Sequence, residues 1–221
     1  MTCGSRYQYI MLSNELSDKI TKYLNECSIT HNICQAEKLC LLIRLLEKWN
    51  EALNLTSVRE PDRMVTSHIM DCAVVVPHME GTEIADVGTG AGFPGLVLAV
   101  LCPDRHFSLI DAVSKKTSFV RTAVSELELD NVTVCTARSE DLEGRLVCDA
   151  VVSRAVAPLG RLISYTWPLL KPHGRLMAMK ASITADELGN LPSTAALIAL
   201  IPLKVPGLDA IRHLVKLERT V

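Results

Sequence analysis

The sequence ADVGTGAGFPG, residues 85–95, has the composition of a loop whose backbone binds a ligand. Glycine adopts positive φ without strain and lets backbone N–H groups approach a phosphate or a cofactor closely. Two registers fit. The G-x-G-x-x-G of residues 90–95 matches a nicotinamide-dinucleotide loop, with Asp111 where a ribose-binding acid is expected. The G-x-G-x-G of residues 88–92 matches the looser loop of S-adenosylmethionine enzymes, with Asp86 closing the strand before it.

Local spacing leaves both registers open. A dinucleotide loop prefers its first glycine directly after the strand, and counting from Gly88 places Phe93 where the third glycine belongs. This favours the methyl donor, and a turn that binds nothing is the least favoured interpretation. Asp111 either caps the helix that starts near Ser114 or accepts hydrogen bonds from ribose hydroxyls. Because Ser114 can cap that helix itself, we expect the ribose role.

Composition limits the classes of protein. With 221 residues, 48% hydrophobic and 22% charged, the chain is an ordinary globular one, and a net charge of −2 means that RNA binding needs a local basic face. Eight cysteines without a C-x-x-C spacing predict buried thiols rather than disulfides or a metal site. Without a recognisable leader sequence or membrane span, the chain is predicted to be cytoplasmic.

The elements that must position these residues follow from periodicity. Apolar residues three and four apart predict helices over residues 1–80, with a polar break at residues 54–57 where Ser57 caps the next helix and Pro61 fits its first turn. From residue 81 to 221, seven short strands alternate with helices. That order predicts an α/β domain with a mostly parallel, doubly wound sheet and an N-terminal helical extension.

Beyond single motifs, long stretches of the sequence resemble one family. KWNEALNLTSVREPDRMVTSHIMDC, IADVGTGAGFPGLVLAVLCPDRHFSLIDAVSKKTSFVR, SRAVAPLGRL and LLKPHGRLMAMK together are similar to the RsmG (GidB) family of ribosomal RNA methyltransferases. The resemblance runs from about Leu39 to Arg219, although residues 183–200 have no obvious match. It implies a Rossmann-like class I fold and S-adenosylmethionine-dependent methylation of N7 of guanine 527 in 16S rRNA.

The resemblance also implies roles for individual residues. Ser139 and Glu140 match the adenine-edge pair, Asp111 holds the ribose hydroxyls, and Arg154 lies at the mouth of the site. Further cofactor-binding residues are expected in the loop that surrounds the methionine part and the ribose edge. They are Asp86, Gly88, Thr89, Gly90, Gly92 and Phe93.

Guanine N7 has a free lone pair and no proton to lose, so we expect alignment without a general base or any catalytic side chain. A paired guanine hides N7 in the narrow major groove of A-form RNA, so the target base must be unpaired or flipped out. The expected RNA contacts are Arg59, His68, Lys115, Lys116 and Arg154. The predicted partner is 16S rRNA or the small ribosomal subunit, and a monomer suffices.

Two other functions are compatible with parts of the sequence. One is an NAD-dependent oxidoreductase that uses the register of residues 90–95, although no catalytic acid or base for it stands out. The other is an RNA-binding assembly factor with a vestigial pocket, which the intact glycine loop disfavours.

Overall fold

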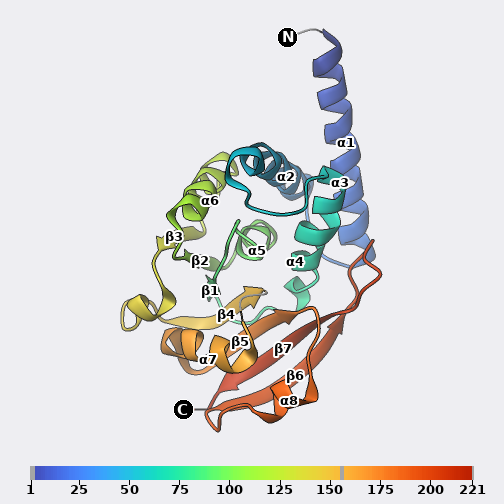
Figure 1. Cartoon of the computed structure of the whole chain (residues 1–221). Helices are drawn as coiled ribbons and strands as arrows, with labels where there is room; N and C mark the ends of the chain where they lie inside the picture. Colours follow the sequence, from blue (N-terminus) through green and yellow to red (C-terminus); the bar gives the residue numbers. More distant parts are fainter. Residues whose placement is uncertain (1–2, 155–156, 221) are drawn as a thin grey trace.

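The computed structural model describes residues 3–154 and 157–220, and these build a seven-stranded sheet with helices on both faces (Figure 1). The strands lie in the order β3-β2-β1-β4-β5-β7-β6. Their bounds are β1 Glu83–Val87, β2 His106–Asp111, β3 Val132–Thr136, β4 Cys148–Arg154, β5 Leu170–Lys180, β6 Ala195–Leu203 and β7 Arg212–Arg219.

Strands β1 to β5 pair in parallel, whereas β7 runs antiparallel between β5 and β6. The predicted fold class, a mostly parallel sheet of seven strands, is therefore confirmed. Because the chain passes outward from β1 through β2 to β3 and then returns to β4, the sheet has a switch point between β1 and β4. Ligands of open α/β sheets bind at such a point, beyond the carboxyl ends of the strands.

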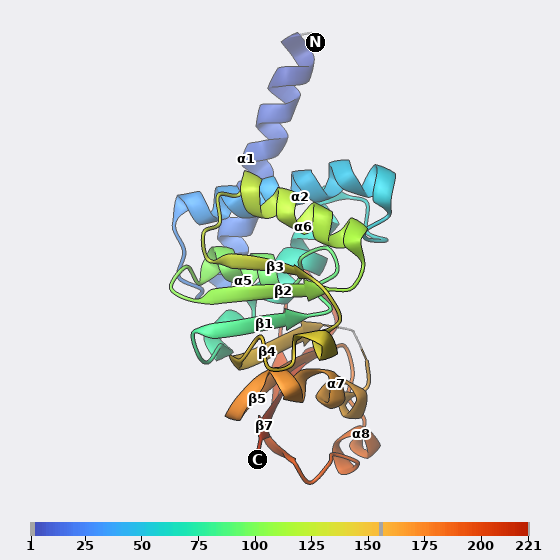
Figure 2. The same cartoon turned by 90° about the vertical axis from the view of Figure 1, so that its left-hand side faces the viewer.

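The helices form two layers (Figures 1 and 2). Helices α5 and α6 cover one face of the sheet, with α2 packed on their outer side, and α7 covers the other face. The bounds are α1 Cys3–Glu26, α2 Ile33–Leu53, α3 Pro61–Met64, α4 Asp71–Ala73, α5 Gly95–Leu101, α6 Ser114–Glu126, α7 Leu159–Thr166 and α8 Ala185–Gly189. Short 3-10 turns lie at Val76–His78, Ser139–Leu142 and Trp167–Leu169.

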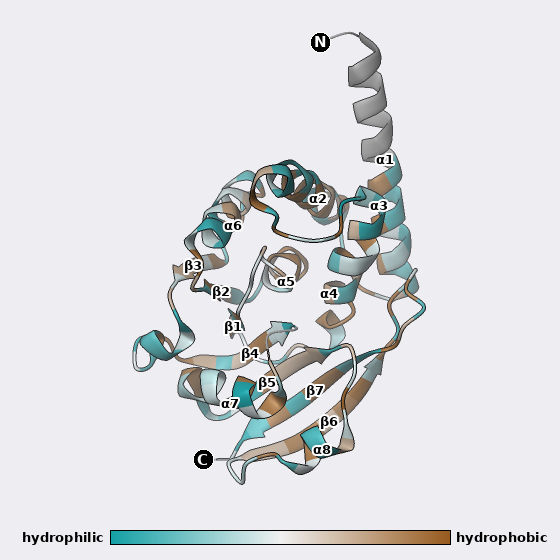
Figure 3. Cartoon of the chain, in the orientation of Figure 1, coloured by the Kyte–Doolittle hydropathy of each residue, from teal (hydrophilic) through white to brown (hydrophobic). Residues whose placement is uncertain are grey.

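Side chains alternate between two hydrophobic cores, as the pleat of a strand requires. On β1, Ile84 belongs to the core under α2, α5 and α6, whereas Ala85 and Val87 belong to the core under α7. The N-terminal helices share the first of these cores with the sheet (Figure 3). In the described residues, side chains from both sides of residue 80 belong to this core, so the division of the chain at residues 80 and 81 stays a prediction.

The N-terminal helices differ in one detail from the sequence pattern. Helix α2 begins with a capping box between Asn32 and Gln35 and ends at Asn54 in the left-handed region. The next helix begins at Pro61 after Glu60, which makes no side-chain cap, so the prediction that Ser57 caps it was wrong. A π-helical turn at Val65–Met70 then joins α3 to α4. Such turns occur often at functional sites.

Two further findings concern chemistry and membranes. The seven cysteines whose side chains the structure describes are all free thiols. Over the described ranges, no helix is both long enough and apolar enough to span a bilayer.

Candidate functional site

The glycine loop follows β1 at the switch point of the sheet. Gly88, Gly90 and Gly92 adopt positive φ values of 73°, 60° and 84°. A Cβ on Gly92 would lie 2.2 Å from Leu96 Cδ1, so Gly92 permits packing of the loop on α5. A Cβ on Gly90 would meet only the Gly88 carbonyl oxygen, at 3.9 Å. Gly90 therefore leaves a space that a side chain would fill and a ligand can use.

Asp86, near the end of β1, holds this loop through hydrogen bonds. Its Oδ2 accepts hydrogen bonds from Thr89 Oγ1 at 2.7 Å and from the Gly95 N–H at 2.8 Å, while no partner in the described chain reaches its buried Oδ1. Burial raises the pKa of this carboxyl to about 6, against the opposing effect of the two hydrogen bonds. Asp86 thus positions the loop, and its predicted part in cofactor binding stays a prediction.

The hydrogen bond from Gly95 also bears on the dinucleotide register. That register requires the first N–H groups of the following helix for a pyrophosphate. Here the Gly95 N–H, at the start of α5, already donates to Asp86. The geometry therefore favours the register of residues 88–92.

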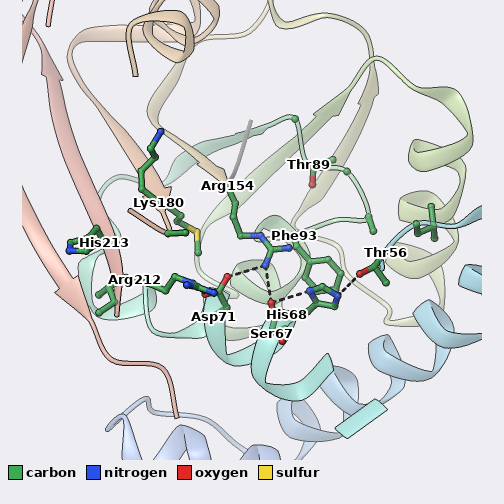
Figure 4. Close-up of a pocket in the computed structure, with 17 residues that line it drawn as sticks. Thr56, Ser67, His68, Asp71, Thr89, Phe93, Arg154, Lys180, Arg212 and His213 are labelled. Atoms are coloured by element: carbon green, nitrogen blue, oxygen red, sulfur yellow. Dashed lines mark hydrogen bonds and ion pairs between the residues drawn. The ribbon is translucent and has the colours of Figure 1, made fainter. Parts of the chain in front are cut away.

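Two cavities share Gly88 as a lining residue. The smaller, of about 230 Å³, is lined by residues that include Asp111, Ser139, Glu140 and Tyr165. The larger, of about 360 Å³, extends toward the ends of β4, β5 and β7 (Figure 4). Its polar and aromatic lining residues are Thr56, Ser67, His68, Asp71, Thr89, Phe93, Arg154, Lys180, Arg212 and His213.

The smaller cavity brings together the three acceptor residues that the sequence predicted for an adenosine. Asp111 Oδ2 accepts from the Gly90 N–H at 3.0 Å, and its Oδ1 accepts from the Val113 N–H at 2.9 Å. Each oxygen of the carboxylate keeps a lone pair for a hydroxyl. Ser139 Oγ, also in the lining, donates to Glu140 Oε2 at 3.1 Å.

The first turn of helix α6 has no side-chain cap. Val113 is its N-cap residue and makes no side-chain cap, so Ser114 does not cap the helix as predicted. The carboxylate of Asp111 instead bonds the Val113 N–H, one residue before the helix.

A stack of three side chains forms one wall of the larger cavity (Figure 4). The His68 ring stacks on Phe93 with centroids 5.0 Å apart, and the Arg154 guanidinium carbon lies 5.5 Å from the centroid of Phe93. Phe93 therefore lines the cavity as predicted, but it is 5% exposed and forms part of the wall rather than an open platform for a base.

His68 is held as a neutral imidazole. Its Nδ1 lies 3.0 Å from the Ser67 carbonyl oxygen, which can only accept, so Nδ1 carries the proton. Nε2 then accepts from Thr56 Oγ1 at 2.9 Å. Burial, followed by the positive charge of Arg154, lowers the pKa of His68 to about 4. The ring is consequently unprotonated at neutral pH.

Asp71 links two arginines that are distant in sequence. Its Oδ2 lies 3.1 Å from Arg154 Nη1 at the end of β4, and its Oδ1 lies 3.0 Å from Arg212 Nε at the start of β7. Arg154 Nη1 also donates to the carbonyl oxygen of Ser67, in the π-helical turn, at 3.1 Å. The turn thus directs both Asp71 and a backbone acceptor toward Arg154. Ala155, of the Ser-Arg-Ala motif, lies outside the described residues.

The other residues predicted to contact RNA lie apart from this cluster. Lys115 and Lys116 open α6 beside the smaller cavity without lining it, and Lys116 Nζ is 3.6 Å from Asp111 Oδ2. Arg59 is exposed before α3 and donates to Asn54 Oδ1 at 3.2 Å. Of the predicted RNA contacts, only His68 and Arg154 line the larger cavity.

Sequence reasoning did not select several lining residues. Lys180, Arg212 and His213 lie at the adjoining ends of β5 and β7, and Tyr165 of α7 lines the smaller cavity. Lys180, Arg212 and His213 could have been selected because they lie at strand ends. That selection requires knowing that β7 inserts beside β5, which the order of the strands in the chain does not reveal.

A family model and individual related proteins point to the same family. The family described as GidB, rRNA small subunit methyltransferase G, matches residues 35–215. The ribosomal RNA small subunit methyltransferase G of Cronobacter sakazakii is 42% identical over 199 residues, covering 90% of this chain and 96% of that protein. The protein of the same name from Pectobacterium carotovorum is 41% identical over 204 residues, covering 92% and 99%.

Solved structures show the same fold at low identity. A SAM-dependent methyltransferase from Aquifex aeolicus aligns with a TM-score of 0.54 and 16% identity, covering 74% of this chain and 96% of that one. The N-methyltransferase NodS from Bradyrhizobium japonicum, in complex with S-adenosyl-L-homocysteine, aligns with a TM-score of 0.55 and 11% identity, covering 80% and 99%.

Proposed function

Because the chain belongs to the rRNA small subunit methyltransferase G family, we propose that it methylates N7 of guanine 527 in 16S rRNA, with S-adenosylmethionine as the methyl donor. The observation that carries this proposal is that two cavities share Gly88 as a lining residue. One is lined by acceptors suited to a nucleoside, and the other is large enough for an unpaired base. A donor that crosses the loop at Gly88 would have its adenosine in the first and its methionine end facing the second.

The residues of the loop fit this donor. Gly90 leaves open the volume that a side chain would occupy, and Asp111 keeps acceptor capacity beside it. We assign Asp111, Ser139 and Glu140 to the adenosine, and Gly88, Thr89 and Arg154 to the methionine end. Asp86 and Gly92 act by shaping the loop, and Phe93 by supporting Arg154.

The bound cofactor supplies an electrophilic methyl group on a positively charged sulfur. The chain needs no general base, since guanine N7 already has a free lone pair. His68 fits this requirement: its ring is neutral, and hydrogen bonds to Ser67 and Thr56 engage both of its nitrogens. The work of the protein is to orient the base and to exclude water, and alignment of this kind supplies most of the acceleration.

Substrate access follows from the shape of the RNA. A guanine in a duplex cannot present N7 to a side-chain-lined cavity, so the target must leave its stack. The larger cavity then receives the base, and Lys115, Lys116 and Arg59 supply contacts to phosphates farther along the strand. We propose that a monomer performs this reaction in the cytoplasm, where the small ribosomal subunit is present.

A methyl-transfer assay tests the proposal. The protein is incubated with S-adenosylmethionine that carries a tritiated methyl group and with small ribosomal subunits from cells that lack the modification. We expect label in 16S rRNA, released by the strand scission that is specific for N7-methylguanine. Absence of label, or label at a different atom, contradicts the proposed function.

A further inference from the structure

Resting on the proposed function, we propose that Arg212 binds a phosphate of the RNA strand at the mouth of the larger cavity, with Asp71 as its positioning residue. Sequence reasoning placed no RNA contact on β7. The inference depends on the charge balance of the cluster, on the position of its groups around the cavity and on the donors that they leave unused.

The charge of the cluster is unbalanced. One carboxylate, Asp71, faces two guanidinium groups, Arg154 at 3.1 Å and Arg212 at 3.0 Å. Asp86 adds an electrostatic interaction on the Arg154 side only, so Arg212 shares its one carboxylate with a second guanidinium. Lys180 adds nothing to the imbalance, since its ammonium lies 2.7 Å from Glu187 Oε1. A cavity wall with a guanidinium that is only partly neutralised is suited to an anion, and RNA presents one phosphate per nucleotide.

The two arginines differ in what they can reach. Arg154 stacks on Phe93, and Phe93 directly follows Gly92 of the glycine loop. Arg154 therefore lies at the end of the cavity where the cofactor is proposed to bind. In Figure 4, Arg212 and His213 lie on the opposite side of Asp71 from Phe93 and Thr89. An anion that belongs to the cofactor therefore meets Arg154, and an anion that arrives with the substrate meets Arg212.

Arg212 has the donors for a phosphate. Its Nε is directed to Asp71, and within the part of the chain that the structure describes neither terminal nitrogen has a hydrogen-bond partner. Its side chain is 28% exposed and lines the larger cavity, so the side chain is held by Asp71 and accessible from that cavity. Arginine with a carboxylate on Nε keeps its planar fork free for two phosphate oxygens.

His213 follows Arg212 on β7. It pairs with Lys180 across the β5–β7 ladder and lines the same cavity. Among the described residues, no partner reaches its buried Nδ1. In Figure 4 the His213 ring lies on the side of Arg212 away from Asp71, so the phosphate contact is assigned to Arg212 alone.

The test measures RNA affinity and cofactor affinity separately. A fluorescein-labelled RNA hairpin that carries the target guanine in its loop is titrated at several salt concentrations, and S-adenosylhomocysteine binding is measured by calorimetry. We compare wild type with Arg212→Gln and Arg212→Lys. Arg145→Gln, in an exposed loop that lines neither cavity, is the control for the loss of one charge.

For Arg212→Gln we expect roughly tenfold weaker RNA binding and a slope of log affinity against log salt that is smaller by about one phosphate contact. S-adenosylhomocysteine affinity should stay within about twofold of wild type. Arg212→Lys should keep the salt slope and lose part of the affinity, because lysine retains the charge without the fork. Arg145→Gln should match wild type in both measurements.

Two outcomes overturn the inference. One is an unchanged RNA affinity and salt slope in Arg212→Gln. The other is a selective loss of S-adenosylhomocysteine binding, which would assign Arg212 to the cofactor. In either case, the proposed function still holds if the wild-type protein methylates the small subunit. A wild-type protein that neither binds the hairpin nor methylates the subunit contradicts the inference and the proposed function together. Thermal unfolding of each variant separates a loss of contact from a loss of fold.

Discussion

The backbone N–H of Gly90 donates to the carboxylate of Asp111 at 3.0 Å, which ties the glycine loop to the end of β2. The same carboxylate receives the Val113 N–H at 2.9 Å. Loop, strand end and the start of α6 are thus held at one carboxylate beside the smaller cavity. Any group that binds there meets a site whose backbone is already fixed.

Replacing Asp111 by Asn should weaken cofactor binding more than it weakens the fold. The amide has one acceptor oxygen for two backbone donors, so either Gly90 or Val113 loses its partner and the ribose loses an acceptor. A net loss of about 1–3 kcal/mol corresponds to roughly 10- to 100-fold weaker S-adenosylhomocysteine binding by calorimetry. Asp130→Asn, at an exposed turn, is the control. Equal affinities in the two variants would remove Asp111 from the site.

Gly90→Ala should abolish cofactor binding at a modest cost in stability. The new Cβ enters open space, but that space is where the ligand is proposed to bind. Gly144 has a similar φ of 72° and also has open space around its Cβ, so Gly144→Ala has the same backbone strain, about 1 kcal/mol, away from the site. Calorimetry should find binding in Gly144→Ala only. If both variants bind S-adenosylhomocysteine as wild type does, the loop does not form the site.

Asp71→Asn should destabilise the protein by about 3 kcal/mol in urea unfolding, because it leaves the partly buried guanidinium of Arg154 without its ion-pair partner. The double variant Asp71→Leu with Arg154→Met should recover much of that loss, since it removes both charges together. Its cofactor affinity should nevertheless remain low, because Arg154 is assigned to the methionine end. An Asp71→Asn protein as stable as wild type would contradict the importance of this pair.

The buried carboxyl of Asp86 should make stability depend on pH. Its folded pKa of about 6 lies above the ordinary value of 3.8, so the folded state binds the extra proton between these values. The contribution is therefore full below about pH 4 and is lost as the pH rises through about 6, a change of about 3 kcal/mol. The unfolding free energy of wild type relative to Asp86→Asn should fall across this range. A constant difference from pH 4 to 7 would contradict the raised pKa.

His68 should take no part in proton transfer. With its pKa near 4, it does not titrate where the enzyme is assayed. The ratio of single-turnover methylation rates between wild type and His68→Gln should therefore be constant from about pH 5.5 to 8. A ratio that changes with an apparent pKa near 6.5 would show that the imidazole titrates during the reaction.

The sequence predicted what local patterns encode. Alternation and periodicity located the strands, and the glycine loop and Asp111 could be proposed as site residues because each lies at or just after the end of a strand. Ser139 and Glu140 were proposed from the family resemblance alone. The two ion pairs of Asp71 were out of reach, since they join residues 83 and 141 positions apart. The π-helical turn was equally hidden, because its apolar spacing is that of an ordinary helix.

The most direct test of the account is a crystal structure of the protein with S-adenosylhomocysteine. We expect the adenosine in the smaller cavity against Asp111, Ser139 and Glu140, the sulfur beside Gly88, and the amino-acid end directed toward Arg154. A ligand bound elsewhere, or one that reaches only one of the two cavities, would contradict the assignment of this crevice as the methyl-donor site.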